Sequence, residues 1–133
     1  MNITYTQDKN ISESVLLDFL ATVNHPALAV KERLLPAMLT NGTLITAWDE
    51  DAEHRLAALI SVIDDGGMNA YVRFMIVGPD YRGKGINDEL LQQVKTIYAD
   101  YPNLTAIAED DFHAGFFTKV GFKLADNAKV LTR

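Results

Sequence analysis

The sequence predicts one mixed α/β domain, in which a central and mostly antiparallel sheet carries helices on both faces. Two segments within the first 40 residues repeat apolar side chains at helical spacing. Between residues 43 and 77 the pattern changes to three segments rich in β-branched and aromatic residues, separated by short turns. The length of 133 residues is enough for one core. We therefore expect a single domain over residues 1–133.

In chain order, the patterns predict a strand at Ile3–Thr6, helices at residues 11–24 and Val30–Leu39, strands at Thr43–Trp48, Leu56–Ile63 and Ala70–Val77, a helix at Ile86–Asp100, a strand at Leu104–Ala108, a helix at Phe112–Val120 and two final strands at Phe122–Leu124 and Lys129–Thr132. Asn10 is the expected N-cap of the first helix, because Glu13 follows three residues later. Pro36 predicts a kink or break in the second helix. Short turns between the three central strands predict antiparallel pairing, and only the crossover helix before Leu104–Ala108 requires a parallel pair. The apolar spacing predicts a core of Leu16, Phe19, Leu20, Leu44, Leu59, Phe74, Ile76, Leu90, Leu91, Val94, Ile107 and Phe122.

The composition argues against several classes of function. The chain has no cysteine and only three scattered histidines, so we expect no disulfide, no thiolate nucleophile and no metal site. No apolar run is long enough to cross a membrane, and no basic segment precedes an apolar one at the start, so we expect a cytoplasmic protein without a signal peptide. A net charge of −6 argues against nucleic acid as the main partner. Basic residues are nevertheless in local excess from Arg73 to Lys95, where an anion could bind.

The segment Met75–Asn87 carries the clearest functional signal. It runs from an apolar strand through the glycine-containing loop Gly78–Gly85 into the start of a helix. The first amides of a helix lack partners within the helix and carry partial positive charge, and glycines allow a bulky anion to approach the backbone. Arg82 and Lys84 add positive charge at the same point. This combination predicts a phosphate-binding site; the alternative is a tight glycine turn with solvated basic side chains.

Two known phosphate-binding patterns fit the loop poorly. A dinucleotide-binding fingerprint requires a third glycine where this sequence has Asp88. A P-loop requires Ser or Thr where this sequence has Gly85, and the preceding hairpins do not build the parallel sheet of that fold.

A third pattern fits the loop well. It resembles the acetyl-CoA-binding motif of the GNAT acetyltransferase superfamily, R/Q-x-x-G-x-G/A, through the run Val77-Gly78-Pro79-Asp80-Tyr81-Arg82-Gly83-Lys84-Gly85-Ile86. About thirty residues later, the second signature of that family, aromatic-Tyr-x-Lys-x-Gly-Phe, is similar to Phe116-Phe117-Thr118-Lys119-Val120-Gly121-Phe122. Small bacterial members are also similar at Thr46-Ala47-Trp48-Asp49 and the hairpin after it. The resemblance covers most of the chain and includes the order of the elements.

The resemblance implies a GNAT fold, in which the strands Ala70–Val77 and Leu104–Ala108 splay apart around a cleft for acetyl-CoA. It implies that the pantetheine arm bonds to the backbone of the first strand and that the pyrophosphate rests on amides after the loop. The cofactor-binding residues expected on this basis are Met75, Ile76, Val77, Arg82, Gly83, Lys84, Gly85, Ile86 and Asn87. An amine then attacks the thioester directly, and a backbone N–H stabilises the oxyanion. The implied partners are acetyl-CoA and a small-molecule amine, whereas the oligomeric state stays open, a homodimer included.

Several positions depart from the family pattern. Phe117 stands where the tyrosine of the family protonates the departing thiolate, and Phe74 stands near the position of an acidic residue often found on the cleft strand. Asn87 ends the acetyl-CoA motif in place of Gly or Ala. His113 and Asp110 remain as candidates for the catalytic group. The alternative for His113 is an exposed position at the start of a helix.

These observations favour an acetyl-CoA-dependent N-acetyltransferase that transfers the acetyl group directly to a small amine. The alternative is a CoA-binding GNAT module with little or no catalytic activity, used for sensing or regulation, and Phe117 and Phe74 favour it. The loss of a general acid lowers a rate by roughly 10²–10⁴-fold and does not abolish it. The enzyme therefore remains the preferred interpretation.

Overall fold

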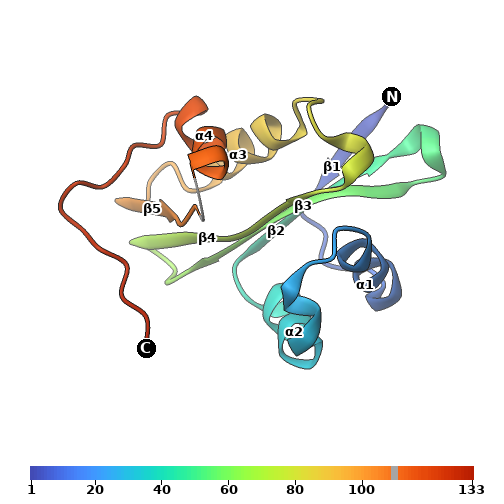
Figure 1. The fold of residues 1–133 in the computed structure, drawn as a ribbon, viewed down its shortest axis with the longest axis horizontal. Helices are drawn as coiled ribbons and strands as arrows, with labels where there is room; N and C mark the ends of the chain where they lie inside the picture. Colours follow the sequence, from blue (N-terminus) through green and yellow to red (C-terminus); the bar gives the residue numbers. More distant parts are fainter. Residues whose placement is uncertain (109–110) are drawn as a thin grey trace.

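The computed structural model describes residues 1–108 and 111–133, without the side chain of Phe112. The strands are β1 (Ile3–Thr6), β2 (Thr43–Asp49), β3 (Arg55–Asp64), β4 (Asn69–Val77) and β5 (Asn103–Ala106). The helices are α1 (Glu13–Thr22), α2 (Lys31–Thr40), α3 (Ile86–Ile97) and α4 (Asp111–Lys119), with short 3₁₀ helices η1 (Pro26–Val30), η2 (Glu50–Ala52) and η3 (Pro79–Tyr81). Figure 1 shows the sheet between two layers of helices, which confirms the predicted mixed α/β class.

The sheet follows the chain, because its strands lie in the order β1-β2-β3-β4-β5. The first four strands pair antiparallel, and only β4 and β5 are parallel, as the connection lengths predicted. Gly42 makes the turn from α2 into β2 with φ of 68°, and a Cβ there would lie 1.8 Å from the carbonyl oxygen of Val62. Only glycine fits this close approach between the turn and β3.

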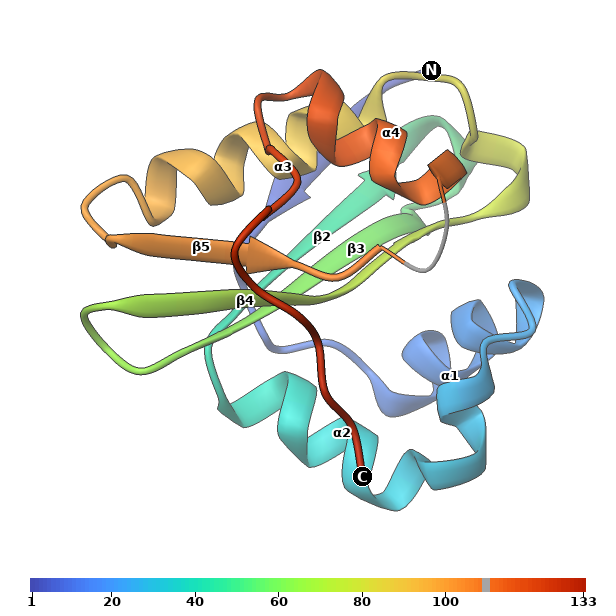
Figure 2. The same ribbon diagram turned by 60° about the vertical axis from the view of Figure 1, so that its left-hand side comes forward.

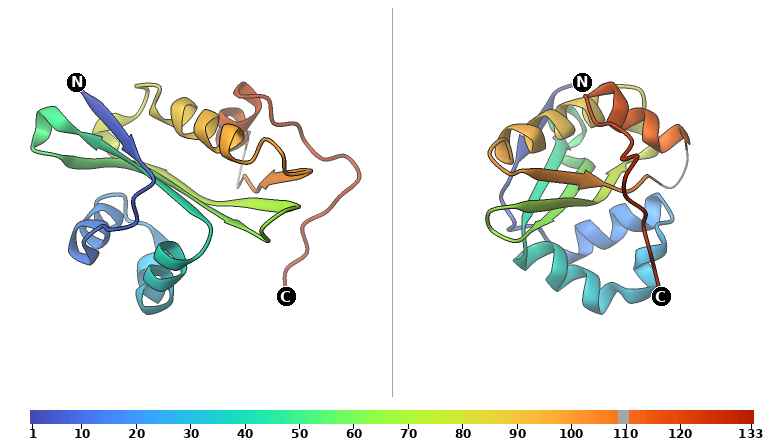
Figure 3. Two further views of the ribbon diagram at one scale, coloured as in Figure 1. Left: turned by 180° about the vertical axis from the view of Figure 1, so that it is seen from behind. Right: turned by 90° about the vertical axis from the view of Figure 1, so that its left-hand side faces the viewer.

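The two faces of the sheet bury separate apolar cores (Figures 1 and 3). On the face covered by α3 and α4, the helices contribute Ile86, Leu90, Leu91, Val94, Tyr98, Phe117 and Val120. On the face covered by α1 and α2, they contribute Leu16, Phe19, Leu20, Leu34, Leu35 and Met38. The predicted core residues are buried or packed against these cores, except Ile107. Ile107 is 47% exposed because it follows the end of β5 at Ala106.

The structure corrects the N-cap predicted for α1 and one of the two outcomes predicted for Pro36 in α2. The N-cap of α1 is Ser12 and not Asn10, whose amide instead donates to the Asp8 carboxylate in the preceding turn. Serine and asparagine are equally good N-caps, so the residue types alone do not decide between them. Pro36 lies inside α2 without breaking it, so the predicted break does not occur, whereas the kink stays a prediction. The hydrogen bond that Pro36 cannot make would reach Glu32 in the exposed first turn, where the freed carbonyl can bond to solvent.

The final strands predicted at Phe122–Leu124 and Lys129–Thr132 are also wrong. Residues 123–133 form neither helix nor strand, and Leu124 and Leu131 are 86% and 89% exposed. A strand needs a hydrogen-bonded neighbour, and Figure 1 shows this segment passing outside the ends of β4 and β5 instead of running beside them. The alternation of apolar residues does not supply such a neighbour by itself.

Candidate functional site

The parallel pair of β4 and β5 comes apart part-way along β4. Its last paired residues are Val72 and Ala106, where β5 ends, whereas β4 continues to Val77 (Figure 2). Within the described residues, Phe74–Val77 therefore pairs with β3 along one edge and has no strand along the other. Backbone amides and carbonyls on such an edge still need hydrogen-bonding partners, so a ligand can bind them. This is the splayed pair of strands that the resemblance implied.

A β-bulge marks the point of separation. Ser61 of β3 pairs with Phe74, and the next pair along the ladder skips Arg73, which is thus an extra residue in β4. Arg73 donates to the Ala37 carbonyl of α2 at 3.2 Å and to Ser61 Oγ at 2.9 Å. Phe74 packs against the core on this same α1–α2 face. In a regular strand two consecutive side chains would point to opposite faces, so the bulge brings this cation and this ring together.

The loop between β4 and α3 is held by contacts to β2 and β3. The Tyr81 hydroxyl in η3 donates to the buried carboxylate of Asp49 at 2.8 Å. Burial raises the pKa of Tyr81, and the hydrogen bond to Asp49 raises it further. The Gly78 amide donates to a β3 carbonyl at 2.8 Å, and Arg55 of β3 forms an ion pair with Asp80 at 3.3 Å. These contacts fix the shape of the loop relative to the sheet.

The N-terminus of α3 is open to an anion. Gly83 and Gly85 have φ of 73° and 80°, and a Cβ at either position would meet no atom within 4 Å. No side chain caps this helix, so its first amides lack partners within it. Asp88 in the first turn forms an ion pair with Lys119 of α4 at 3.1 Å, which offsets its negative charge. The open space lined by amides therefore fits a phosphate group.

The three strand residues predicted to hold acetyl-CoA lie where β4 pairs with β3 along one edge and with no described strand along the other. Met75 and Val77 pack toward the α3–α4 core, and Ile76 is buried in the α1–α2 core. Their side chains are thus committed to the two cores. What they offer a ligand along the open edge is backbone.

The loop residues predicted for the same role lie at or beside the start of α3. Arg82 and Lys84 are exposed, and neither forms an ion pair with another described residue. Ile86 is buried in the α3–α4 core. Asn87 is half-buried, and its Oδ1 is buried without a hydrogen-bond partner among the described residues. As an acceptor, this oxygen suits an N–H group of a ligand and not a phosphate oxygen.

The residues considered for proton transfer have different surroundings. Phe117 is buried in the α3–α4 core, where its ring packs edge-on against Phe122 with centroids 5.4 Å apart. His113 is exposed on α4, and its ring centroid lies 6.3 Å from that of Phe116. Asp110 lies outside the described residues. The Phe117 ring is therefore packed in the core, and it carries no proton to donate.

Two residues shape this site although neither was among the site residues predicted from the sequence. Asp49 holds Tyr81 from a strand 32 residues earlier in the chain. Arg73 lies at the bulge where β4 and β5 separate. A signal for Arg73 was present, since it is the only charged residue in the apolar segment Ala70–Val77.

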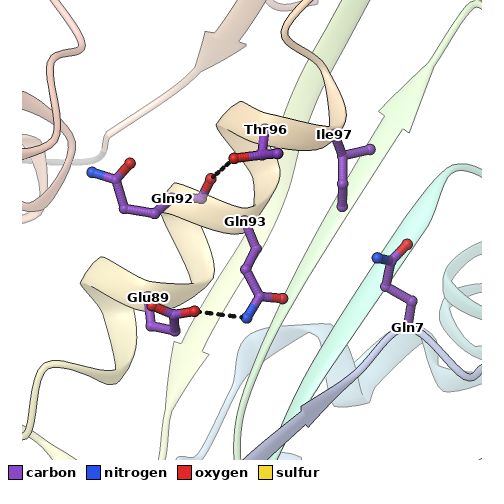
Figure 4. Close-up of a pocket in the computed structure, with 6 residues that line it drawn as sticks. All are labelled: Gln7, Glu89, Gln92, Gln93, Thr96 and Ile97. Carbon is purple, nitrogen blue, oxygen red and sulfur yellow. Dashed lines mark hydrogen bonds between the residues drawn. The ribbon is translucent and has the colours of Figure 1, made fainter.

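Elsewhere the described part of the chain offers no comparable site. Within residues 1–108 and 111–133, no three potential metal ligands gather, and no helix is long and apolar enough to span a membrane. A shallow hollow beside α3 is lined by Gln7, Glu89, Gln92, Gln93, Thr96 and Ile97 (Figure 4). Its side chains bond along the helix, Gln93 to Glu89 at 2.9 Å and Thr96 to the Gln92 carbonyl at 3.1 Å. These groups already have partners in one another.

Comparison with known proteins agrees with this geometry. The family model described as an acetyltransferase (GNAT) domain matches residues 5–131. An uncharacterized N-acetyltransferase, ycf52, from Pyropia yezoensis is 28% identical over 130 residues, which cover 91% of this chain and 70% of that protein.

Solved structures share the fold. A GNAT-family acetyltransferase from Streptococcus pneumoniae TIGR4 superposes with a TM-score of 0.84 at 21% identity, covering 99% of this chain and 98% of the other. A predicted acetyltransferase with acetyl-CoA from Clostridium acetobutylicum has a TM-score of 0.66 at 19% identity, covering 98% and 95%. Since the family model spans nearly the whole chain and the fold agrees with it, the chain belongs to the GNAT acetyltransferase family.

Proposed function

We propose that residues 1–133 form one domain that acts as an acetyl-CoA-dependent N-acetyltransferase on a small amine. The observation that carries this proposal is the continuity of two open surfaces. The unpaired edge of Phe74–Val77 leads, through a loop anchored by Tyr81, to the uncapped start of α3. The first surface suits the amides of a pantetheine arm, and the second suits a pyrophosphate. Use of acetyl-CoA is general in the GNAT family, and the similar C. acetobutylicum protein carries it.

Each part of the surface has its own role in this proposal. The amides of Gly83–Asn87 bind the pyrophosphate oxygens, and Arg82 and Lys84 add positive charge beside them. Met75–Val77 bind the pantetheine arm through their backbone, because their side chains pack into the two cores. The buried Oδ1 of Asn87 accepts a hydrogen bond from a ligand N–H group, which supplies the partner that it otherwise lacks.

The transfer step requires the acceptor amine in its neutral form, because an ammonium nitrogen has no lone pair. A base or a chain of water molecules takes the proton of the amine. The nitrogen then attacks the carbonyl carbon of the thioester, and a backbone N–H of β4 stabilises the oxyanion. The C–N bond forms, the C–S bond breaks, and CoA leaves as a thiolate. The nitrogen releases one further proton as the amide forms, and the thiolate takes up one proton. The products are the acetylated amine and CoA, with no change in oxidation state.

Phe117 leaves the departing thiolate without the proton donor that the resemblance implies. A thiolate is a fair leaving group, since a cysteine-like thiol has a pKa of about 8.5, so turnover persists without that donor. The substitution Phe117→Tyr adds a hydroxyl to the ring and should raise turnover by up to roughly 10²–10⁴-fold while leaving acetyl-CoA affinity unchanged. Phe117→Leu is the packing control, and it should give no gain. An unchanged rate in Phe117→Tyr would assign Phe117 to packing alone.

The test of the proposed function is release of the CoA thiol from acetyl-CoA in the presence of a panel of amines. Calorimetric titration of acetyl-CoA is done in parallel on the same protein. Amine-dependent thiol release with an N-acetylated product supports the enzyme. Tight acetyl-CoA binding without turnover, in both wild type and Phe117→Tyr, would instead support a CoA-binding module with little activity. Lack of acetyl-CoA binding would contradict both functions.

A further inference from the structure

Arg73 is a half-buried cation that uses only part of its hydrogen-bonding capacity. Its Nη2 donates to the carbonyl oxygen of Ala37 at 3.2 Å and to Ser61 Oγ at 2.9 Å. The remaining N–H groups, on Nε and Nη1, have no acceptor among the described residues, and Nε is buried. No carboxylate within residues 1–108 or 111–133 forms an ion pair with the guanidinium.

A partly buried charge with unpaired N–H groups raises the free energy of the folded state unless an anion binds to it. Burial lowers the pKa of Arg73, which means that its charge is less well solvated than in water. The guanidinium carbon lies 5.5 Å from the centroid of the Phe74 ring, a contact that stabilises a cation only modestly. A desolvated positive charge with unused donors is a favourable partner for a carboxylate, because charge-assisted hydrogen bonds are the strongest that side chains make.

Arg73 also lies where an acceptor has to approach. The open edge of β4 begins directly after it. If the pantetheine arm bonds to Met75–Val77, the acetyl group at its end lies next along the strand, beside Phe74 and Arg73. The guanidinium faces α2, on the opposite face of the sheet from α3. An amine that enters from the α1–α2 side therefore meets Arg73 next to the thioester.

The rest of this side is mostly apolar, apart from the His25 ring, which packs edge-on against Phe74 with centroids 5.4 Å apart. Phe74 lines a small, closely packed pocket that has no room for a water molecule, together with Leu20, His25, Ala27, Leu34, Met38 and Ile76. No lining residue is acidic, so the pocket itself offers no counter-ion to an ammonium group. Arg73, in contact with Phe74, adds a positive charge beside this apolar surface.

We infer that Arg73 binds a carboxylate of the acceptor, so that the acceptor is a small amine that also carries a carboxylate group. This inference rests on the proposed function, because it concerns the second substrate of the same site. The amine presents its nitrogen to the thioester while its carboxylate accepts hydrogen bonds from the guanidinium. The arginine is a specificity residue in this arrangement and takes no part in proton transfer.

The first test compares matched acceptors on the wild-type protein. The pairs are L-amino acids with their primary amides, and β-alanine with β-alaninamide. Each pair differs in one charge at the same distance from the amine. The amide member has the more readily deprotonated amine, so intrinsic reactivity favours it and the comparison is conservative. We expect kcat/KM to be roughly 10- to 100-fold higher for the carboxylate member, the size of a charge-assisted hydrogen bond.

The second test changes Arg73 and keeps the acceptors. Arg73→Gln should remove the preference for the carboxylate, lowering kcat/KM roughly 10- to 100-fold for that member and leaving the amide member unchanged. Arg73→Lys keeps the charge and should retain part of the preference. The matched control is Arg33→Gln, which removes one exposed charge from α2 and should change neither acceptor. Unchanged acetyl-CoA affinity in each variant shows that the fold is intact.

The outcomes separate this inference from the proposed function. Equal activity of the wild type on both members of every pair, or an equal loss for both in Arg73→Gln, overturns the inference and leaves the acetyltransferase in place. If acetyl-CoA binds but no amine is acetylated, the inference is tested by titrating the amines that carry a carboxylate group into the CoA complex. Binding to wild type but not to Arg73→Gln supports the inference, and no binding overturns it. Failure to bind acetyl-CoA removes the proposed function and this inference together.

Discussion

Helix α3 is tied to the sheet at its C-terminal end and left open at its N-terminal end. At the C-terminal end, the Tyr98 hydroxyl lies 2.8 Å from both Asp64 and Thr43, and Tyr101 adds a longer bond of 3.4 Å to Asp64. At the N-terminal end, Gly85 is an N-cap without a side-chain hydrogen bond. At the C-terminal end, the tyrosine hydroxyls thus have hydrogen-bond partners that hold α3 on the sheet. At the N-terminal end, the first amides of α3 have no side-chain partner among the described residues and can bind a ligand.

The largest expected effect comes from closing the open end. Gly85→Glu places a carboxylate in front of the α3 amides and a side chain at a φ of 80°, so acetyl-CoA binding should be abolished in calorimetry. Gly66→Glu is the matched control, because Gly66 also has a positive φ of 86° and open space around its Cβ position. It lies in the turn between β3 and β4 and should retain the affinity. Equal affinity in wild type and Gly85→Glu would remove the loop from the site.

A second effect acts on the body of the helix, which holds both ends in place. Leu91 is fully buried against the sheet, so Leu91→Ala should lower the free energy of unfolding by about 2–5 kcal/mol in urea denaturation. Ile97 in the same helix is 37% exposed, and Ile97→Ala should cost less than about 1 kcal/mol. A loss below about 0.5 kcal/mol for Leu91→Ala would mean that the buried face of α3 is assigned wrongly.

A third, smaller effect concerns the anchor of the loop. Tyr81→Phe removes the hydroxyl that donates to Asp49, a residue that is only 7% exposed, and should lower the free energy of unfolding by about 1.5–3 kcal/mol. It should also weaken acetyl-CoA binding, because the loop loses a contact that fixes its shape. Tyr71→Phe on β4 removes a hydroxyl with no side-chain hydrogen bond in the described residues and should change both quantities little. Equal effects of the two substitutions would contradict the claim that the Tyr81–Asp49 hydrogen bond fixes the loop.

The smallest effect tests the closed end through its pH dependence. Burial raises the pKa of Tyr98 to about 12, and the bond to Asp64 acts in the same direction. A raised pKa stabilises the folded state fully below the ordinary value of about 10, and this contribution is lost as the pH rises from there toward 12. The stability of the wild type should therefore fall from pH 9 to 10.5, and that of Tyr98→Phe should fall less. Parallel urea-denaturation profiles for the two proteins would contradict this assignment.

What the sequence could predict follows from how local each feature is. The loop at the open end depends on consecutive residues, since Gly83 and Gly85 form the turn and Ile86 starts the helix. The antiparallel strands are equally local, because short turns join them. By contrast, the hydrogen bonds from Tyr98 and Tyr101 to Asp64 join residues 34 and 37 positions apart, and no local sequence pattern predicts them.

Arg73 and the C-terminal segment show two ways in which a local pattern falls short. Alternation along β4 would place Arg73 and Phe74 on opposite faces, but one extra residue at the bulge brings their side chains together. In residues 122–132 the apolar alternation predicted two strands, yet among the described residues no strand lies alongside to accept their hydrogen bonds. Both outcomes depend on neighbours that lie elsewhere in the chain.

The most direct test of the central claim is amide hydrogen exchange with and without acetyl-CoA. The claim is that the open end of α3 and the unpaired edge of β4 hold this ligand. Acetyl-CoA should slow exchange at Gly83–Asn87 and Met75–Val77, and leave exchange around Tyr98 and Tyr101 unchanged. Protection of equal size at both ends of α3, or protection confined to other segments while acetyl-CoA is bound, would contradict the account.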